Sequence, residues 1–154
     1  MLTVRNALET TGLAGKYLGL ELTESMLMEN PQEIARTLKT IKDMGVKVSI
    51  DDFGTGYSSF SNLRRFPLDE LKIDRSFLNS VPKNADDTAI VGAMIAMAHG
   101  LGLGVVAEGV EREEQLDFLR DRGCDEYQGF LASKPLLASD FLKLVAKNRK
   151  QLGD

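Results

Sequence analysis

The chain has 154 residues, 43% hydrophobic and 27% charged, a size and composition typical of one globular domain with a sizeable core. Because 23 Asp and Glu residues outnumber 19 Lys and Arg residues, the net charge is -4, which excludes a general electrostatic attraction to DNA, RNA or an anionic membrane. The single cysteine, Cys124, excludes an internal disulfide, and no apolar run is long enough to cross a bilayer. With no signal-peptide pattern at residues 1–6, we expect a cytoplasmic protein.

Short β-type segments alternate with amphipathic helical segments along the whole chain. The helix predicted at residues 31–44 has Ile34, Leu38 and Ile41 at spacings of four and three, with Gly45 to end it. Strands are predicted at residues 18–22, 46–50, 70–74, 104–108 and 125–130, and helices at 31–44, 58–66, 85–99, 112–122 and 139–148. This alternation is typical of βαβ units around a parallel sheet.

Polar side chains lie at or near the carboxyl ends of the predicted strands: Glu21, Asp51, Lys72, Asp74, Glu108 and Gln128. A (β/α)8 barrel places its catalytic groups at these strand ends, whereas a doubly wound sheet gathers its ligand groups at one switch point. We therefore predict an α/β fold of the (β/α)8 TIM-barrel type. Such a barrel has eight strands in about 250 residues. We expect an incomplete barrel of about five βα units.

The segment DDFGTGYSS, residues 51–59, has the composition of a metal and phosphate site. Adjacent strand residues point to opposite faces, so Asp51 and Asp52 address one site only if the strand ends there and the chain turns at Gly54 and Gly56. These glycines also let backbone N–H groups and hydroxyls such as that of Thr55 approach an anion. Two adjacent carboxylates repel each other, which favours a bound divalent cation. The alternative is an Asp N-cap followed by a glycine turn.

Basic residues near these acids allow two interpretations each. Lys72 could orient hydroxide and add positive charge at a phosphoryl group, or it could be a strand lysine paired with Asp74 or another acid. Its position between the acidic segments favours the first. Arg64 and Arg65 fit a solvated helix face or a contact with phosphate.

Five segments resemble, in order and spacing, the motifs of the EAL domain of bacterial cyclic di-GMP phosphodiesterases: ELTES (21–25), DDFGTGYSS (51–59), LKID (71–74), VAEGVE (106–111) and YQGF (127–130). The resemblance implies a (β/α)8-type barrel in bacterial second-messenger signalling. It also implies hydrolysis of one phosphodiester of cyclic di-GMP, giving linear pGpG, with two Mg²⁺ or Mn²⁺ ions. Two hard cations suit this reaction because they activate water and neutralise phosphoryl charge.

The resemblance also implies a role for each site residue. The metal ligands would be Glu21, Asp51, Asp52 and Glu108, with Asp51 bridging the two ions. Lys72 would hold the attacking water, Glu108 would serve the same network, and Glu24 would brace the loop from Asp52 to Ser58. The residues that would contact or support the substrate are Asp74, Gln128, Thr55 and Gly56.

Two motifs of the resembled family are not found in these 154 residues. They are the Glu-Ala-Leu motif, whose glutamate ligates a metal, and an asparagine ligand on a later strand. We therefore expect residues 1–154 to be an N-terminally truncated EAL-type phosphodiesterase domain that forms a homodimer or larger assembly through open sheet edges. Two alternatives remain: a catalytically inactive module that binds cyclic di-GMP or dimerises, and a metal-dependent barrel hydrolase for another phosphoester.

Overall fold

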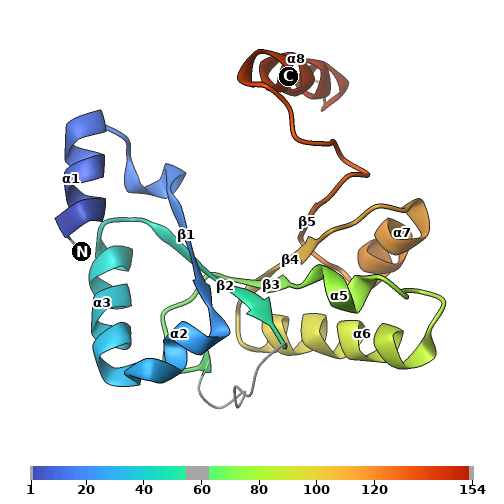
Figure 1. Cartoon of the computed structure of the whole chain (residues 1–154), viewed down its shortest axis with the longest axis horizontal. Coiled ribbons are helices and arrows are strands. Elements are labelled where there is room, and N and C mark those ends of the chain that lie inside the picture. Colours follow the sequence, from blue (N-terminus) through green and yellow to red (C-terminus); the bar gives the residue numbers. More distant parts are fainter. Residues whose placement is uncertain (1, 55–62, 153–154) are drawn as a thin grey trace.

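A five-stranded parallel sheet forms the centre of the computed structural model, which describes residues 2–54 and 63–152 (Figure 1). The strands lie in sequence order: β1 (Gly19–Thr23), β2 (Lys47–Phe53), β3 (Glu70–Ile73), β4 (Gly104–Glu108) and β5 (Glu126–Gln128). Each strand pairs in parallel with the next. The predicted α/β fold with a parallel sheet is confirmed. Within the described residues, the outer edges of β1 and β5 pair with no further strand.

Helices connect the strands and add both ends of the chain: α1 (Leu2–Thr11), η1 (Gly15–Tyr17), α2 (Glu24–Glu29), α3 (Pro31–Asp43), α5 (Arg75–Leu78), α6 (Ala85–Gly100), α7 (Glu113–Asp121) and α8 (Ala138–Leu152). The four longer predicted helices correspond to α3, α6, α7 and α8, whereas the short helices α2 and α5 were not predicted. Most of the helix predicted at 58–66 falls outside the described residues. No helix of the described part is long and apolar enough to span a membrane.

The sheet has one apolar face and one polar face because side chains alternate along each strand. The apolar face carries the fully buried side chains Val48, Ile50, Leu71, Ile73, Val105 and Ala107. These residues share one core with Leu38 and Ile41 of α3 and Ile95 of α6, so these two helices cover that face (Figure 1). The alternate positions carry Glu21, Asp51, Lys72, Glu108 and Gln128.

The end of β2 corrects one expectation about the two adjacent acids. The strand continues to Phe53 instead of ending at Ile50, and its pairing with β3 shifts, with Ile50 opposite Leu71 and Phe53 opposite Ile73. One residue of β3, Lys72, therefore faces two residues of β2. This two-to-one pairing is a β-bulge, and Asp52 adopts a φ of 54° within it. The bulge, and not the end of the strand, interrupts the alternation of side-chain directions at Asp51 and Asp52.

Helix α8 lies apart from the rest of the molecule. It follows the extended segment after β5 and stands clear of the sheet in Figure 1. Large apolar side chains on and before α8 are exposed, including Leu137 at 77% and Leu142 at 66%.

Candidate functional site

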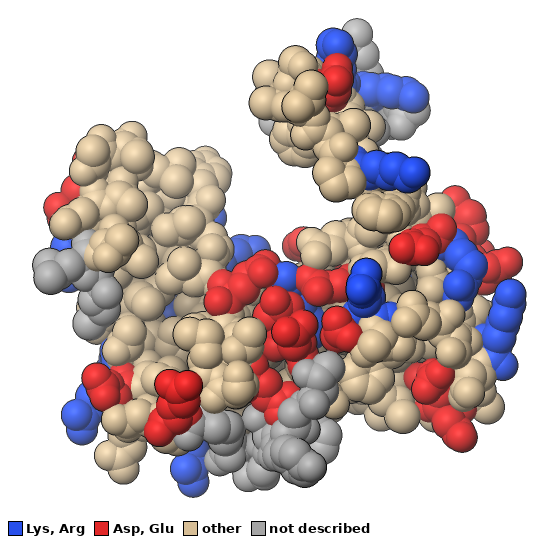
Figure 2. Space-filling view, in the orientation of Figure 1, with Lys and Arg blue, Asp and Glu red and all other residues tan. Residues whose placement is uncertain are grey.

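The amino group of Lys72 is the centre of a cluster of carboxylates on the polar face of the sheet. Lys72 Nζ lies 2.7 Å from Glu21 Oε1, 2.5 Å from Glu108 Oε1 and 3.6 Å from Asp51 Oδ1. The three acids come from β1, β2 and β4, on both sides of β3. Figure 2 shows acidic side chains gathered near the centre of the molecule in this view.

Strand register explains why these residues meet. Glu21 pairs with Ser49, so Asp51 lies two residues further along the same face of β2. The register with β3 shifts after Ile50, which brings Asp51 beside Lys72. Because parallel strands present their carboxyl ends at one edge of a sheet, side chains that are distant in sequence converge there.

Lys72 is held in its charged form. Its side chain is 7% exposed. This burial alone lowers the pKa of Lys72, but hydrogen bonds with Glu108 and Glu21 and the charges of Glu108 and Asp51 outweigh it and raise the pKa above its ordinary value. Lys72 can therefore donate hydrogen bonds and stabilise negative charge at neutral pH, but it cannot act as a general base.

Gln128 joins this cluster through Glu108. The two residues face each other across β4 and β5, and Gln128 Nε2 donates a 2.6 Å hydrogen bond to Glu108 Oε1. Glu108 Oε1 is thus shared between Lys72 and Gln128, which orients the carboxylate from two sides.

Asp52 and Glu24 lie at the loop that follows β2. Asp52 N donates to Asp51 Oδ1 at 3.0 Å, so the bulge also orients Asp51. Glu24, 5% exposed in the first turn of α2, accepts a 3.1 Å hydrogen bond from Gly54 N. Gly54 has a φ of 94°, and a side-chain carbon there would lie 3.0 Å from the Phe77 ring. The backbone at this point therefore requires glycine.

The remaining predicted site residues lie elsewhere or are not described. Asp74 Oδ1 accepts a hydrogen bond from Ser76 N at 2.9 Å and caps α5. Hydrogen bonds with Ser76 hold the pKa of Asp74 below its ordinary value. Thr55 and Gly56 lie outside the described residues.

The cluster has the donor chemistry of a divalent cation site. Its acids offer only carboxylate oxygens, the ligands that Mg²⁺, Mn²⁺ and Ca²⁺ prefer. Within the described residues, however, no three His, Cys, Asp or Glu side chains are already arranged to hold a metal ion. Glu21, Asp51 and Glu108 instead converge on Lys72. A divalent cation at these carboxylates would compete with the lysine for the same oxygens.

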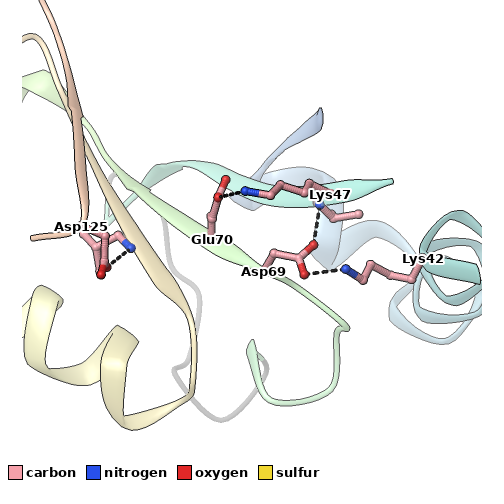
Figure 3. A network of polar contacts seen from close by, with 7 residues as sticks. Lys42, Lys47, Asp69, Glu70 and Asp125 are labelled. Atoms are coloured by element: carbon pink, nitrogen blue, oxygen red, sulfur yellow. Dashed lines mark hydrogen bonds and ion pairs between the residues drawn. The ribbon is translucent and has the colours of Figure 1, made fainter. Parts of the chain in front are cut away.

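Two supporting carboxylates, Asp69 and Asp125, stand out only in the structure (Figure 3). Asp69 Oδ2 accepts a hydrogen bond from Val48 N, and Asp125 Oδ2 accepts one from Val105 N, each at 2.8 Å. These two residues anchor β2 and β4 near the amino ends of the strands, whereas the Lys72 cluster lies toward their carboxyl ends. The only sequence signal is an acid directly before a predicted strand or at its first residue.

Comparison with known proteins identifies the family. The EAL domain family matches residues 1–135. The chain belongs to the EAL domain family. Domains of this family are TIM-barrel-like, so the predicted barrel type is confirmed, as is the resemblance of the five motifs.

Similar proteins include cyclic di-GMP phosphodiesterases. The cyclic di-GMP phosphodiesterase NbdA of Pseudomonas aeruginosa is 53% identical over 133 residues, which are 86% of this chain and 17% of NbdA. The c-di-GMP complex of the PaMucR phosphodiesterase matches with a TM-score of 0.85 and 48% identity, over 90% of this chain and 56% of that chain. The manganese and cyclic di-GMP complex of Klebsiella pneumoniae BlrP1 matches with a TM-score of 0.78 and 35% identity, over 86% of this chain and 34% of that chain. The chain spans about a fifth of the length of its curated relatives.

Proposed function

We propose that this EAL domain chain hydrolyses cyclic di-GMP to linear pGpG, with residues 1–154 forming part of an EAL-type phosphodiesterase domain. The observation that carries this proposal is the convergence of Glu21, Asp51 and Glu108 on Lys72. The relatives named as cyclic di-GMP phosphodiesterases support the substrate.

In this mechanism, Glu21, Asp51, Asp52 and Glu108 would hold two divalent ions, for which we propose Mg²⁺ or Mn²⁺. When bound, the ions supply activation of water and neutralisation of phosphoryl charge. Manganese in the BlrP1 complex supports this choice.

Lys72 would orient the attacking water and stabilise the negative charge that develops on the phosphoryl oxygens. Its raised pKa keeps this donor charged. Gln128 would hold Glu108 through the hydrogen bond between them, and Glu24 would hold the loop after Asp52 through Gly54 N. For Asp74, Thr55 and Gly56 we propose contacts with the substrate.

The test is product analysis by chromatography. The protein is incubated with cyclic di-GMP and either Mg²⁺ or Mn²⁺, and EDTA is added to a parallel reaction. We expect pGpG in both metal reactions and none with EDTA. Glu21→Gln should abolish the product, whereas Glu9→Gln, at an exposed position on α1, should leave it unchanged. Lys72→Ala should lower turnover far more than cyclic di-GMP binding, because the charge that Lys72 stabilises develops in the transition state.

A second candidate is a module that binds cyclic di-GMP or dimerises without hydrolysing it. The observation that favours it is that no described group of three acids is yet arranged for a metal. Saturable binding of cyclic di-GMP without pGpG in either metal would select this candidate. Hydrolysis of a different phosphodiester, with cyclic di-GMP left intact, would indicate another metal-dependent hydrolase. For either function we propose a homodimer or larger assembly.

A further inference from the structure

A groove of about 510 Å³ lies between α3 and the segment that leads toward β3. Its lining combines apolar and basic side chains: Ala35, Arg36, Lys39, Arg64, Arg65, Phe66 and Pro67. The volume lies within the range of small-molecule sites. Three of these residues are apolar and four are cationic, with two cations on α3 and two on the segment before β3.

The four cations have no acidic partner. Within the described residues, the side chains of Arg36, Lys39, Arg64 and Arg65 form no ion pair or hydrogen bond. Residues 55–62, TGYSSFSN, which precede Leu63 in the sequence, contain no Asp or Glu. Lys42, one turn further along α3, is in contrast paired with Asp69. Four uncompensated positive charges at one groove, in a chain of net charge -4, favour an anion there.

The fold holds both walls of the groove in place. On one side, Leu38 and Ile41 anchor α3 in the core, so Arg36 and Lys39 project from a fixed helix. On the other, Leu63 and Phe66 are buried, and Phe66 N donates to Leu63 O at 3.1 Å. The Lys42–Asp69 ion pair joins the two sides next to the groove. The positive charges are therefore gathered by packing before any ligand binds.

We propose that this groove binds a nucleoside di- or triphosphate. Three of the four cations are arginines, whose planar guanidinium groups donate paired hydrogen bonds to phosphate oxygens. Half-buried Ala35 and Pro67, with the small exposed part of Phe66, give the groove an apolar surface that suits the face of a nucleobase, which inorganic phosphate lacks. The ligand is thus an anion with an apolar body, not a simple ion.

The groove is separate from the Lys72 cluster. Residues 64–67 lead to Asp69, which is hydrogen bonded to Val48 near the amino end of β2, whereas the Lys72 cluster lies toward the carboxyl ends of the strands. The inference does not rest on the proposed hydrolysis of cyclic di-GMP, and either can fail without the other.

Isothermal titration calorimetry with ATP, in 150 mM salt and with EDTA, tests this site, because EDTA prevents binding through a metal at the acidic cluster. We expect saturable one-to-one binding that excess cyclic di-GMP does not displace, with pyrophosphate at least about fivefold weaker because it lacks the base. The double variant Arg64→Gln/Arg65→Gln, and separately Arg36→Gln/Lys39→Gln, should weaken ATP binding at least about tenfold.

A matched control removes the same charge elsewhere. Lys83 and Lys147 are exposed and distant in sequence from the groove, and Lys83→Gln/Lys147→Gln should change ATP affinity by less than about twofold. Thermal unfolding verifies that each variant is folded. The inference is overturned by absence of saturable ATP binding, by equal losses in the control and groove variants, by pyrophosphate binding as tightly as ATP, or by displacement of ATP by cyclic di-GMP.

Discussion

Lys72 combines a structural role at the centre of the acidic cluster with the chemical role proposed for it. The strand places its amino group among Glu21, Asp51 and Glu108, which would repel one another without a cation between them. The lysine supplies that cation in the absence of metal. It also competes with any divalent ion for the same oxygens. The carboxylates can therefore be neutralised either by Lys72 or by a bound divalent cation.

Lys72→Met should destabilise the metal-free protein by about 1–3 kcal/mol, because it removes the cation shared by Glu21, Asp51 and Glu108 and the hydrogen bonds that Glu21 and Glu108 accept from it. Mn²⁺ should restore more stability to the variant than to the original chain, since the ion no longer competes with the lysine. Urea unfolding in EDTA and in Mn²⁺ measures both effects.

Lys47→Met is the matched control for this change. Lys47 also pairs with an acid on the neighbouring strand, Glu70, at 3.0 Å, but its side chain is 56% exposed. Its loss should cost less than about 1 kcal/mol. Equal costs for the two variants would contradict a special role of the cluster in stability.

Cys124 should react slowly with alkylating reagents. Burial, only partly offset by a hydrogen bond with Glu126, raises the pKa of this thiol from 9.0 to about 11. At pH 8 its reactive thiolate fraction is then about a hundredfold lower than that of an ordinary cysteine. The folded state favours the neutral thiol, so the raised pKa of Cys124 stabilises the fold. This stabilisation is fully present below pH 9 and decreases as the pH rises toward 11. Rates of iodoacetamide labelling between pH 7 and 10, compared with glutathione, measure this; equal rates would contradict it.

At the scale of elements, carboxylates fix where strands begin. Asp69 contacts three elements: its carboxylate accepts from Val48 N of β2 and pairs with Lys42 of α3, and its carbonyl accepts from Gly104 N of β4. Figure 3 shows the first two contacts, together with the nearby ion pair between Lys47 and Glu70. Because register determines which side chains reach Lys72, these anchors act on the site from the opposite end of the strands.

Asp69→Ala should destabilise the fold by about 1–3 kcal/mol, because it leaves the buried Val48 N–H without an acceptor. Lys42→Ala removes only a partly exposed ion pair and should cost less than about 1 kcal/mol. The free energies of unfolding of both variants, measured by chemical denaturation, separate the contribution of the hydrogen bond to Val48 N from that of the Lys42–Asp69 ion pair.

Asp69→Asn supplies the control, because an amide oxygen can still accept from Val48 N although the ion pair is lost. Its stability should resemble that of Lys42→Ala. If Asp69→Asn is instead as unstable as Asp69→Ala, the ion pair and not the backbone hydrogen bond carries the effect.

For the whole molecule, exposed sheet edges and α8 point to association. The outer edges of β1 and β5 have no partner strand within residues 2–54 and 63–152, and apolar side chains on and before α8 are exposed. Covering apolar surface stabilises a complex by about 25 cal/mol per Å². Open strand edges favour pairing with a further strand.

We expect a homodimer or larger assembly at micromolar concentration, measured by light scattering across a dilution series. Leu137→Ser/Leu142→Ser should shift the equilibrium toward the monomer, because these are among the most exposed apolar side chains. Ile90→Ser, on α6 and 43% exposed, is the control and should have little effect. A monomer at all concentrations, with cooperative unfolding, would show that the chain closes its own core.

The amino-acid sequence by itself determined the alternation of strands and helices and the identity of the clustered residues. Ile34, Leu38 and Ile41 specify α3 through helical periodicity, and the apolar alternation of the strands specifies which positions are buried. The five motifs, read in order, were sufficient to predict the family. These features are local, since each depends on residues a few positions apart.

Only the tertiary structure decided how the acids reach a common centre. The bulge at Asp51 and Asp52 depends on Phe53 pairing with Ile73, a contact between strands that no local pattern contains. Helix α5, at four residues, is too short for periodicity, so Asp74 is predicted as the end of a strand although it caps that helix. Glu21 and Glu108 meet at Lys72 although 87 positions separate them. Strand register depends on the packing of the whole sheet, which is the physical reason that motifs predict the members of this cluster but not its geometry.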